Sequence, residues 1–331
     1  MSVCELARRW EWALVLLASM QAVQLTPNVM CCGSTLSALE KGKQWERALF
    51  LLEDMAQWCV FPDVVAYNAA ISACEKARSW RAAVALLAEM RLKRLVPTLV
   101  SYSAAISACE KQRQWGLAMA LLEEMLESGC GVDALAFHAV VSACEAGEQW
   151  ERAIGLLMAM PGLKLSPSTE AFNAAVSACA KGAEWQRALQ LLSLLCGDQT
   201  VQVPHRLAWH GEELPHPTII SFNSLFGGLS GQRWSLAVAL LNAASIAELR
   251  PDLVTLRRAL QTLLASSCPA PQLLELLCVV LPLLCQACAL PLQADEAALE
   301  ALLAAGALQM YGAASGGAVD RAVRCRAVAP A

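Results

Sequence analysis

Charged residues are scarce in this sequence. They make up 16% of its 331 residues, and the formal net charge is −4, whereas a typical globular chain is about 25% charged. No overall positive field therefore draws the chain onto a polyanion, and any such contact depends on a local surface. The composition is instead 57% hydrophobic, which is ample for a core and excludes intrinsic disorder over most of the length.

Long uninterrupted hydrophobic runs are also missing. A membrane-spanning helix needs about 18 or more consecutive apolar residues, and charged side chains interrupt nearly every apolar run before that length. The longest candidate, residues 273–290, contains Glu275, Pro282 and Gln286. We interpret this segment as a buried helix, and we expect no membrane among the partners of the chain.

The sequence lacks the signatures of catalysis. It has no Walker loop, no Gly-x-Ser-x-Gly elbow and no dinucleotide fingerprint. A single Cys-x-x-Cys at 285–288 has no second pair, and a loop with three histidines lacks metalloprotease spacing. We therefore predict a chain that is not an enzyme, with no catalytic residue, metal site, cofactor or small-molecule substrate. A hydrolase that uses His205, His210 and His216 stays open as a distant alternative.

What the sequence does contain is a period of 35 residues, which its tryptophans reveal first. Methionine, proline and a Ser-Ala-Cys triplet recur with the same step. Unrelated residue types stay in phase only if one structural unit is repeated, and a period of this size indicates a solenoid. The tryptophans in phase are Trp10, Trp45, Trp80, Trp115, Trp150 and Trp185.

Each unit is predicted to be a pair of helices. In the unit at 64–98, apolar residues spaced as on one helical face predict a helix over 66–76 and another over 80–92, and Pro97 ends the unit. So short a pair cannot bury its apolar face alone and must stack on its neighbours. We predict an all-α fold, a right-handed αα-superhelix (solenoid) of helix-turn-helix repeats of about 35 residues.

Two columns of the repeat are predicted to be structural. The tryptophan that opens each second helix is expected to fill the seam between stacked units. One cysteine per unit falls on the apolar stripe, where a free cysteine behaves as a small buried hydrophobe. These cysteines are Cys74, Cys109, Cys144 and Cys179.

The period also divides the chain into segments. Residues 1–28 form a truncated first repeat, because the chain begins in phase with the middle of a first helix, and we expect the natural protein to extend further toward the N-terminus. The fifth complete unit carries an insertion at 196–210. A degenerate repeat and C-terminal helical cap follow at 253–310, and a flexible tail at 311–331. The complete units are 29–63, 64–98, 99–133, 134–168, 169–218 and 219–252.

The repeat resembles the pentatricopeptide repeat. The resemblance lies in the 35-residue period, in a first helix that opens with Val-x-Tyr-Asn-Ala-x-Ile-Ser-Ala-Cys, and in a close at Met followed by Val-Pro-Thr or Phe-Pro-Asp. The tetratricopeptide repeat differs, because its period is about 34 residues and its Trp lies early in the first helix. The resemblance implies modular recognition of single-stranded RNA, about one base per repeat.

The resemblance also implies which side chains read the bases. In the family the fifth residue of a unit works with its last residue. Asn223 with Asp252 resembles a uracil-preferring pair, and Asn can donate to and accept from a pyrimidine edge. From the unit at 29–63 onward, the implied target is unread, pyrimidine, G, unread, pyrimidine, U. The implied readers, unit by unit, are Asn68 and Thr98, Ser103 and Asp133, His138 and Ser168, Asn173 and Thr218, and Asn223 and Asp252.

Two further columns are implied by the resemblance. Apolar residues at the second place of adjacent units would clamp each base, although Glu170 departs from this pattern; they are Val65, Val100, Leu135, Ile220 and Val254. Lysines late in the first helix would meet the phosphates. Glutamate lies near each of them in sequence, which partly cancels the positive charge. These lysines are Lys41, Lys76, Lys111 and Lys181.

The resemblance implies a role in RNA processing, stability or translation in an organelle, chloroplast or mitochondrion, with other RNA-processing proteins as further partners. A rival interpretation is a helical scaffold that mediates protein–protein interaction, which the net negative charge and Glu170 would suit. The dependence of binding on salt concentration distinguishes the two interpretations. Binding through several phosphates weakens steeply as the salt concentration rises, whereas an apolar contact does not.

Overall fold

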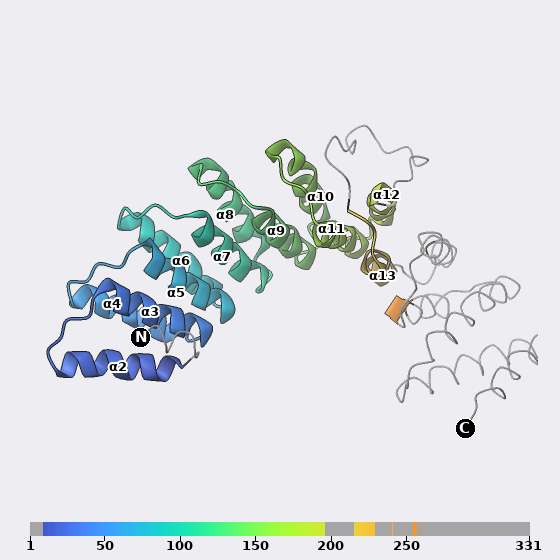
Figure 1. The fold of residues 1–331 in the computed structure, drawn as a ribbon. Helices are drawn as coiled ribbons and strands as arrows, with labels where there is room; N and C mark the ends of the chain where they lie inside the picture. The colour runs from blue at the N-terminus through green and yellow to red at the C-terminus, as the bar shows by residue number, and fades with distance from the viewer. Residues whose placement is uncertain (1–8, 196–214, 229–239, 241–253, 256–257, 259–331) are drawn as a thin grey trace, which may run out of the picture. The chain divides into compact units, whose positions relative to one another are not determined.

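The computed structural model describes residues 9–195, 215–228, 240, 254–255 and 258. By its internal packing the chain divides into two units, residues 1–229 and 230–331, and every described helix belongs to the first (Figure 1). Within the described residues all regular structure is helical. The helices are α2 Trp10–Ala22, α3 Val29–Lys41, α4 Trp45–Gln57, α5 Val64–Lys76, α6 Trp80–Leu92, α7 Leu99–Glu110, α8 Trp115–Ser128, α9 Ala134–Ala146, α10 Trp150–Ala159, the 3-10 helix η1 Pro161–Leu163, α11 Thr169–Lys181, α12 Trp185–Leu195 and α13 Ile219–Gly228.

The first helix of each pair begins at a polar cap. The side-chain Oδ1 of Asp63 accepts a hydrogen bond from the backbone N–H of Ala66 at 2.8 Å, which satisfies a donor that has no partner inside the helix. The predicted helices at 66–76 and 80–92 are confirmed by α5 and α6. Helix α5 begins two residues earlier than predicted, at Val64, because Asp63 supplies the cap.

The turn between the two helices of a pair has the same backbone conformation in successive units. In each pair, a residue with positive φ lies two positions before that tryptophan. A left-handed residue ends a helix by turning its last backbone groups away from the helical path. These residues have φ between 57° and 60°, and they are Lys43, Arg78, Arg113, Glu148 and Ala183.

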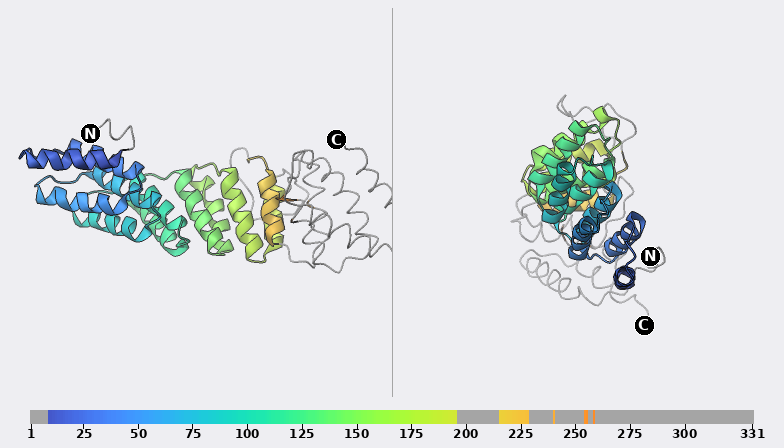
Figure 2. Two further views of the ribbon diagram at one scale, coloured as in Figure 1. Left: turned by 90° about the horizontal axis from the view of Figure 1, so that it is seen from below. Right: turned by 90° about the vertical axis from the view of Figure 1, so that its left-hand side faces the viewer.

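The helix pairs form two layers. The first helices of the pairs, α3, α5, α7, α9, α11 and α13, pack one against the next. From α4 to α12, each second helix packs against the first helix of its own pair and that of the following pair (Figure 1, Figure 2). Every pair thus covers apolar surface that its neighbour leaves open, which is how a solenoid is stabilised. The prediction of an all-α solenoid of repeated helix pairs is confirmed.

The core lies between the layers and is as periodic as the sequence. The predicted cysteine column is buried, and burial raises the pKa of the Cys74 thiol to about 12 and that of Cys109 to about 11. Both thiols are therefore neutral and act as small hydrophobic groups, as predicted. The largest buried side chains are the aromatic rings at the fourth place of the five units from 64–98 to 219–252, Tyr67, Tyr102, Phe137, Phe172 and Phe222.

Several predictions fall on parts of the chain outside the described residues. Among the residues that are described, none belongs to a helix both long and apolar enough to cross a membrane. The segments outside the description are the start of the truncated repeat at 1–8, the insertion at 196–210 with residues 211–214 after it, the unit at 219–252 beyond residue 228 except residue 240, nearly all of the degenerate repeat and cap at 253–310, the Cys-x-x-Cys at 285–288 and the tail at 311–331.

Candidate functional site

One face of each first helix carries the residues singled out from the sequence. On α7 they are Val100, Ser103 and Ser107, with Lys111 at the C-cap; they follow one another at steps of three or four residues and so share a face. Val100 is 57% exposed, so this face meets solvent. We call the second, fifth, ninth, twelfth and thirteenth positions of the units the open face.

The fifth and last residues of the unit at 64–98 meet beside the next first helix. Nδ2 of Asn68 donates to Oγ1 of Thr98 at 3.2 Å. The Ser101 hydroxyl donates to Oδ1 of Asn68 at 2.5 Å and accepts from the backbone N–H of Thr98 at 2.9 Å. These contacts leave the Asn68 amide one N–H and one lone pair for a further partner.

The same cluster forms again across the longer unit at 169–218. Nδ2 of Asn173 donates to Oγ1 of Thr218 at 3.4 Å, and the Ser221 hydroxyl donates to Oδ1 of Asn173 at 2.5 Å. The backbone N–H of Thr218 donates to the Ser221 hydroxyl at 3.1 Å. We call the two groups the Asn–Thr–Ser clusters. Two of the predicted reading pairs are thus brought together by direct hydrogen bonds.

The unit at 99–133 is arranged differently. Asp133 Oδ1 accepts from the backbone N–H of Ala136 at 2.8 Å, so its carboxylate caps α9. The Ser103 hydroxyl oxygen is buried and has no hydrogen-bond partner. A buried hydroxyl without a partner is costly, so a ligand that reached Ser103 would satisfy a group that the protein leaves open.

The remaining predicted pairs are only partly described. Ser168 Oγ accepts from the backbone N–H of Ala171 at 3.2 Å and so caps α11; no hydrogen bond joins Ser168 to His138 in the described part of the chain. Asn223 is 9% exposed, and its predicted partner Asp252 lies outside the described residues.

The second position of the units forms a column of exposed apolar side chains. Large apolar groups in water are costly unless something covers them, and the predicted clamp residues all share this exposure. Met30, which the sequence analysis missed, belongs to the same column, and its phase of 35 residues before Val65 was the available signal. Glu170 is the exposed acidic exception. The exposed fractions in the unit at 1–229 are 79% for Met30, 68% for Val65, 57% for Val100, 73% for Leu135 and 60% for Ile220; Val254, which belongs to the unit at 230–331, is 50% exposed.

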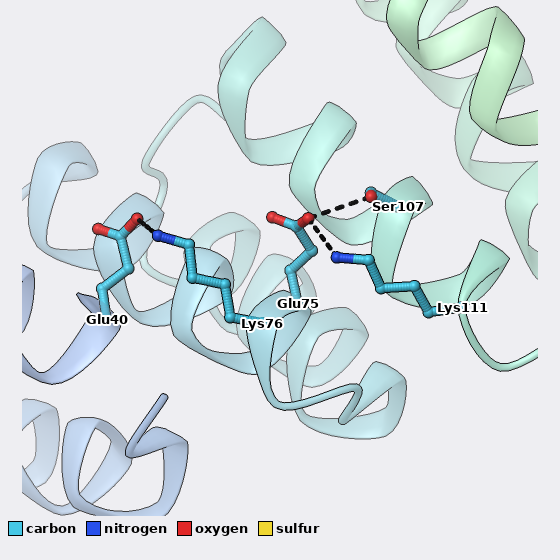
Figure 3. A network of polar contacts seen from close by, with 5 residues as sticks. All are labelled: Glu40, Glu75, Lys76, Ser107 and Lys111. Carbon is cyan, nitrogen blue, oxygen red and sulfur yellow. Dashed lines mark hydrogen bonds and ion pairs between the residues drawn. The ribbon is translucent and has the colours of Figure 1, made fainter. Parts of the chain in front are cut away.

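Three of the four predicted lysines, Lys76, Lys111 and Lys181, each pair with a glutamate of the preceding unit. Lys76 Nζ lies 2.7 Å from Oε1 of Glu40, and Lys111 Nζ lies 2.7 Å from Oε1 of Glu75 (Figure 3). The Ser107 hydroxyl also donates to Glu75, at 3.1 Å (Figure 3). We call this series of interactions the Glu–Lys ladder. The glutamate adjacent in sequence is not the partner, because neighbouring residues on a helix point in different directions.

The Glu–Lys ladder is interrupted once within the described units. Lys181 Nζ lies 3.0 Å from Oε1 of Glu145, and the Ser177 hydroxyl donates to the same oxygen at 2.6 Å. Between these rungs, Ala146 occupies the lysine position opposite Glu110. The open face therefore carries a carboxylate at this place without the lysine that accompanies it elsewhere.

Three tryptophans pack across unit boundaries, as predicted. The Arg152 guanidinium lies over the Trp115 ring, 4.4 Å from its centroid, and Arg187 lies over Trp150 at 4.6 Å. Arg47 stacks on Trp10 in the same way, at 4.0 Å. These tryptophans are committed to packing and cation–π contacts with the next unit, which supports the prediction that they are not platforms for bases.

Glycine makes that stacking possible. A Cβ at Gly147 would overlap Cδ1 of Trp115, and one at Gly182 would lie 2.5 Å from Cδ1 of Trp150. Only a residue without a side chain lets the ring lie this close to the backbone. Among the described residues, no group of three potential metal ligands is assembled.

Three family models match the N-terminal part of the chain. The pentatricopeptide repeat domain matches residues 15–75, the PPR repeat family matches residues 62–110, and the PPR repeat matches residues 100–130. A search of curated proteins finds no match to this chain.

A solved structure of a pentatricopeptide repeat protein shares the fold, and a second one is more distantly similar. The pentatricopeptide repeat protein PPR10 from maize matches with a TM-score of 0.56 at 23% identity, over 83% of this chain and 38% of the maize chain. The PPR domain of Arabidopsis thaliana protein-only RNase P 1, in complex with tRNA, matches with a TM-score of 0.41 at 12% identity, over 62% of this chain and 92% of that domain. The chain thus spans well under half the length of the maize protein.

Proposed function

Because the chain is a pentatricopeptide repeat protein, we propose that the open face of its first helices binds single-stranded RNA with sequence specificity, about one base per repeat. The observation that carries the proposal is the pair of Asn–Thr–Ser clusters. In both, the fifth and last residues of one unit lie within hydrogen-bond distance, at 3.2 Å and 3.4 Å. Two polar side chains held together in this way can contact the edge of the same base.

The exposed column at the second position supports the same ligand. Val65 lies on the same helix as Asn68 and Val100 lies on the first helix of the next unit, and both side chains are more than half exposed. A base has two apolar faces and a polar edge, so apolar groups above and below it and an amide at its edge match its chemistry. The column gives each base a place to stack and removes apolar surface from water.

The charge arrangement predicts modest affinity with strong salt dependence. Lys76, Lys111 and Lys181 are the cations that would meet the phosphates, and each is already paired with a glutamate. A phosphate must share or displace that carboxylate, so part of the electrostatic gain is offset. The counterions that RNA releases on binding still make the affinity fall as salt rises.

The finer proposal concerns target and role. We propose that four of the six units from 29–63 to 219–252 each select a base. In chain order the preferences are none, pyrimidine, G, none, pyrimidine and U. We further propose that the protein acts in RNA processing, stability or translation in a chloroplast or mitochondrion, with no catalytic step of its own. Its specificity then depends on the open face, and other proteins supply any chemistry on the RNA.

Selection from a random-sequence pool of single-stranded RNA tests the proposal. We expect enriched sequences with a guanine flanked by pyrimidines, and Ser103→Asn should change the preferred base at one position only. A duplex RNA of the same composition should compete poorly, because its base edges are already paired. Absence of any enriched motif for the unmodified protein would contradict sequence-specific binding.

The salt dependence separates RNA from a protein partner. The double variant Lys76→Gln with Lys111→Gln should reduce the slope of log affinity against log salt by about 1.4, since each phosphate contact on a single strand contributes about 0.7. The matched control is Lys93→Gln with Lys164→Gln, which removes the same charge away from the open face. Equal slopes for both variants, with binding that resists salt, would favour the protein scaffold.

A further inference from the structure

We infer that Ser101 and Ser221, at the third position of the following unit, are positioning residues that set the orientation of the reading asparagines. This inference rests on the proposed function and extends it, because it adds a residue outside the fifth and last positions. Each serine makes the shortest contact of its cluster, 2.5 Å from its hydroxyl to Oδ1 of the asparagine. Both serine residues are fully buried, so they act on a base only through the asparagine.

An asparagine side chain presents a fixed arrangement of donor and acceptor to a base only if another group holds its amide in one orientation. Rotation by 180° exchanges its N–H donors with its oxygen acceptor at almost no change in shape. Thr98 alone does not select between the two orientations, because its hydroxyl can donate to Oδ1 or accept from Nδ2. Ser101 completes the arrangement, because its oxygen accepts the backbone N–H of Thr98 at 2.9 Å and lies 3.1 Å from Oγ1 of Thr98. When Thr98 accepts from Nδ2 of Asn68 and donates to Ser101, both lone pairs of the Ser101 oxygen are occupied, and its proton is directed toward Oδ1 of Asn68.

The chain of donors is also cooperative. A hydroxyl that accepts a hydrogen bond becomes a better donor in turn, so the fixed backbone N–H of Thr98 strengthens the bond from Ser101 to Asn68. The result is an amide with Oδ1 toward Ser101 and Nδ2 toward Thr98. Its remaining N–H and lone pair then occupy fixed places. Since uracil and cytosine present opposite donors and acceptors at the same edge, a fixed amide can discriminate where a rotating one cannot.

The sequence pattern supports a link between the last residue and this serine. Serine stands at the third position after Thr98 and after Thr218, and in both cases the cluster forms. After Asp63, Asp133 and Ser168, the third position is alanine, and the last residue caps the next helix directly. In the described part of the chain, serine thus stands at the third position in the two places where the unit before it ends in threonine. In these two units the asparagine at the fifth position bonds to a threonine hydroxyl and not to a carboxylate.

The test measures base preference at single positions. A random-sequence pool of single-stranded RNA is selected with the unmodified protein, with Ser101→Ala and with Ser221→Ala, and Asn68→Ala and Asn173→Ala identify the position that each asparagine reads. We expect each serine variant to lose about five- to tenfold of the preference at its own position, as the loss of one hydrogen bond implies. Preferences at all other positions should be unchanged.

Ser107→Ala is the matched control, because it removes a hydroxyl from the same helix that bonds across units to Glu75 and not to an asparagine. If Ser101→Ala and Ser221→Ala fold and keep their base preferences, or weaken binding uniformly as Ser107→Ala does, the inference is wrong while the proposed function stands. If one variant does not fold, the other decides. If the unmodified protein enriches no motif, the proposed function and the inference fall together.

Discussion

Helix α7 takes part in two junctions that are stabilised in different ways. The first junction lies between the units at 64–98 and 99–133, and the second lies between 99–133 and 134–168. At the first, the Asn–Thr–Ser cluster and the Glu75–Lys111 ion pair tie neighbouring units together along the open face. At the second, the open face carries the buried Ser103 hydroxyl, which has no hydrogen-bond partner.

The second junction is stabilised at a different place, at the start of the second helices α8 and α10. The Trp115 ring lies against the backbone of Gly147 and under the guanidinium of Arg152. At the first junction Trp80 has no such arginine, because Leu117 occupies the position of Arg152, and Arg81 of its own helix lies 5.3 Å from its ring centroid. The first junction is thus stabilised by polar contacts on the open face, and the second is stabilised by packing around the tryptophan.

This difference indicates where the protein leaves polar groups for a ligand. A junction whose open-face side chains satisfy one another is stable by itself but offers fewer free hydrogen-bonding positions. A junction held by a tryptophan can leave its open-face groups unpaired. The unit with Ser103 and Asp133 should therefore gain more from a bound base than the unit with Asn68 and Thr98 does.

The largest expected effect is at the tryptophan of the second junction. Trp115→Ala should lower the free energy of unfolding by about 3 kcal/mol, because it removes a large ring from a packed seam. Trp80→Ala should cost about 1 kcal/mol less, because no arginine of the next unit stacks on Trp80. Urea titrations of both variants measure the difference. Equal losses would mean that the stack contributes nothing specific.

A smaller effect is expected at the glycine beneath that ring. Gly147→Ala places a Cβ against Trp115 and should destabilise the protein by about 1–2 kcal/mol, as overpacking does. Gly155→Ala is the matched control, since nothing lies within 4 Å of its added Cβ, and it should stabilise helix α10 by up to about 1 kcal/mol. Thermal melting of the two variants should shift in opposite directions, and a shared direction would contradict the close contact.

The smallest effect concerns the interruption of the Glu–Lys ladder. Ala146→Lys should complete the pair with Glu110 and stabilise the second junction by about 0.5 kcal/mol at low salt. The gain should disappear at high salt, because exposed ion pairs are screened. Melting temperatures at two salt concentrations measure it. A gain that persists at high salt would have to come from helix packing, since the ion pair would be screened.

The sequence predicts most of the fold because single residue types recur in phase. The repeated tryptophan, such as Trp80, marks the start of a second helix, and the cysteine of the Ser-Ala-Cys triplet, such as Cys74, marks a buried stripe. The helices predicted at 66–76 and 80–92 agree with α5 and α6 to within two residues. The cap at Asp63 explains the one shift, since a cap precedes the first apolar position of its helix.

The polar contacts between units were harder to predict. Glu75 precedes Lys76 in the sequence, yet Lys76 pairs with Glu40 and Glu75 pairs with Lys111, because partners across stacked units lie 36 residues apart. Ser101 was missed for a different reason. The third position holds alanine in several units, so no period marks it, and among the described residues a serine there bonds to an asparagine only in the two units that follow a threonine.

Base reading by the fifth and last residues of a unit is tested by transfer of the first junction's cluster into the second. The triple variant Ser103→Asn, Asp133→Thr, Ala136→Ser reproduces Asn68, Thr98 and Ser101 one unit further along, and selection from a random-sequence RNA pool reads the outcome. We expect that the guanine at this one position becomes a pyrimidine, with the flanking preferences unchanged. A guanine that persists in the folded variant would contradict base reading by these side chains.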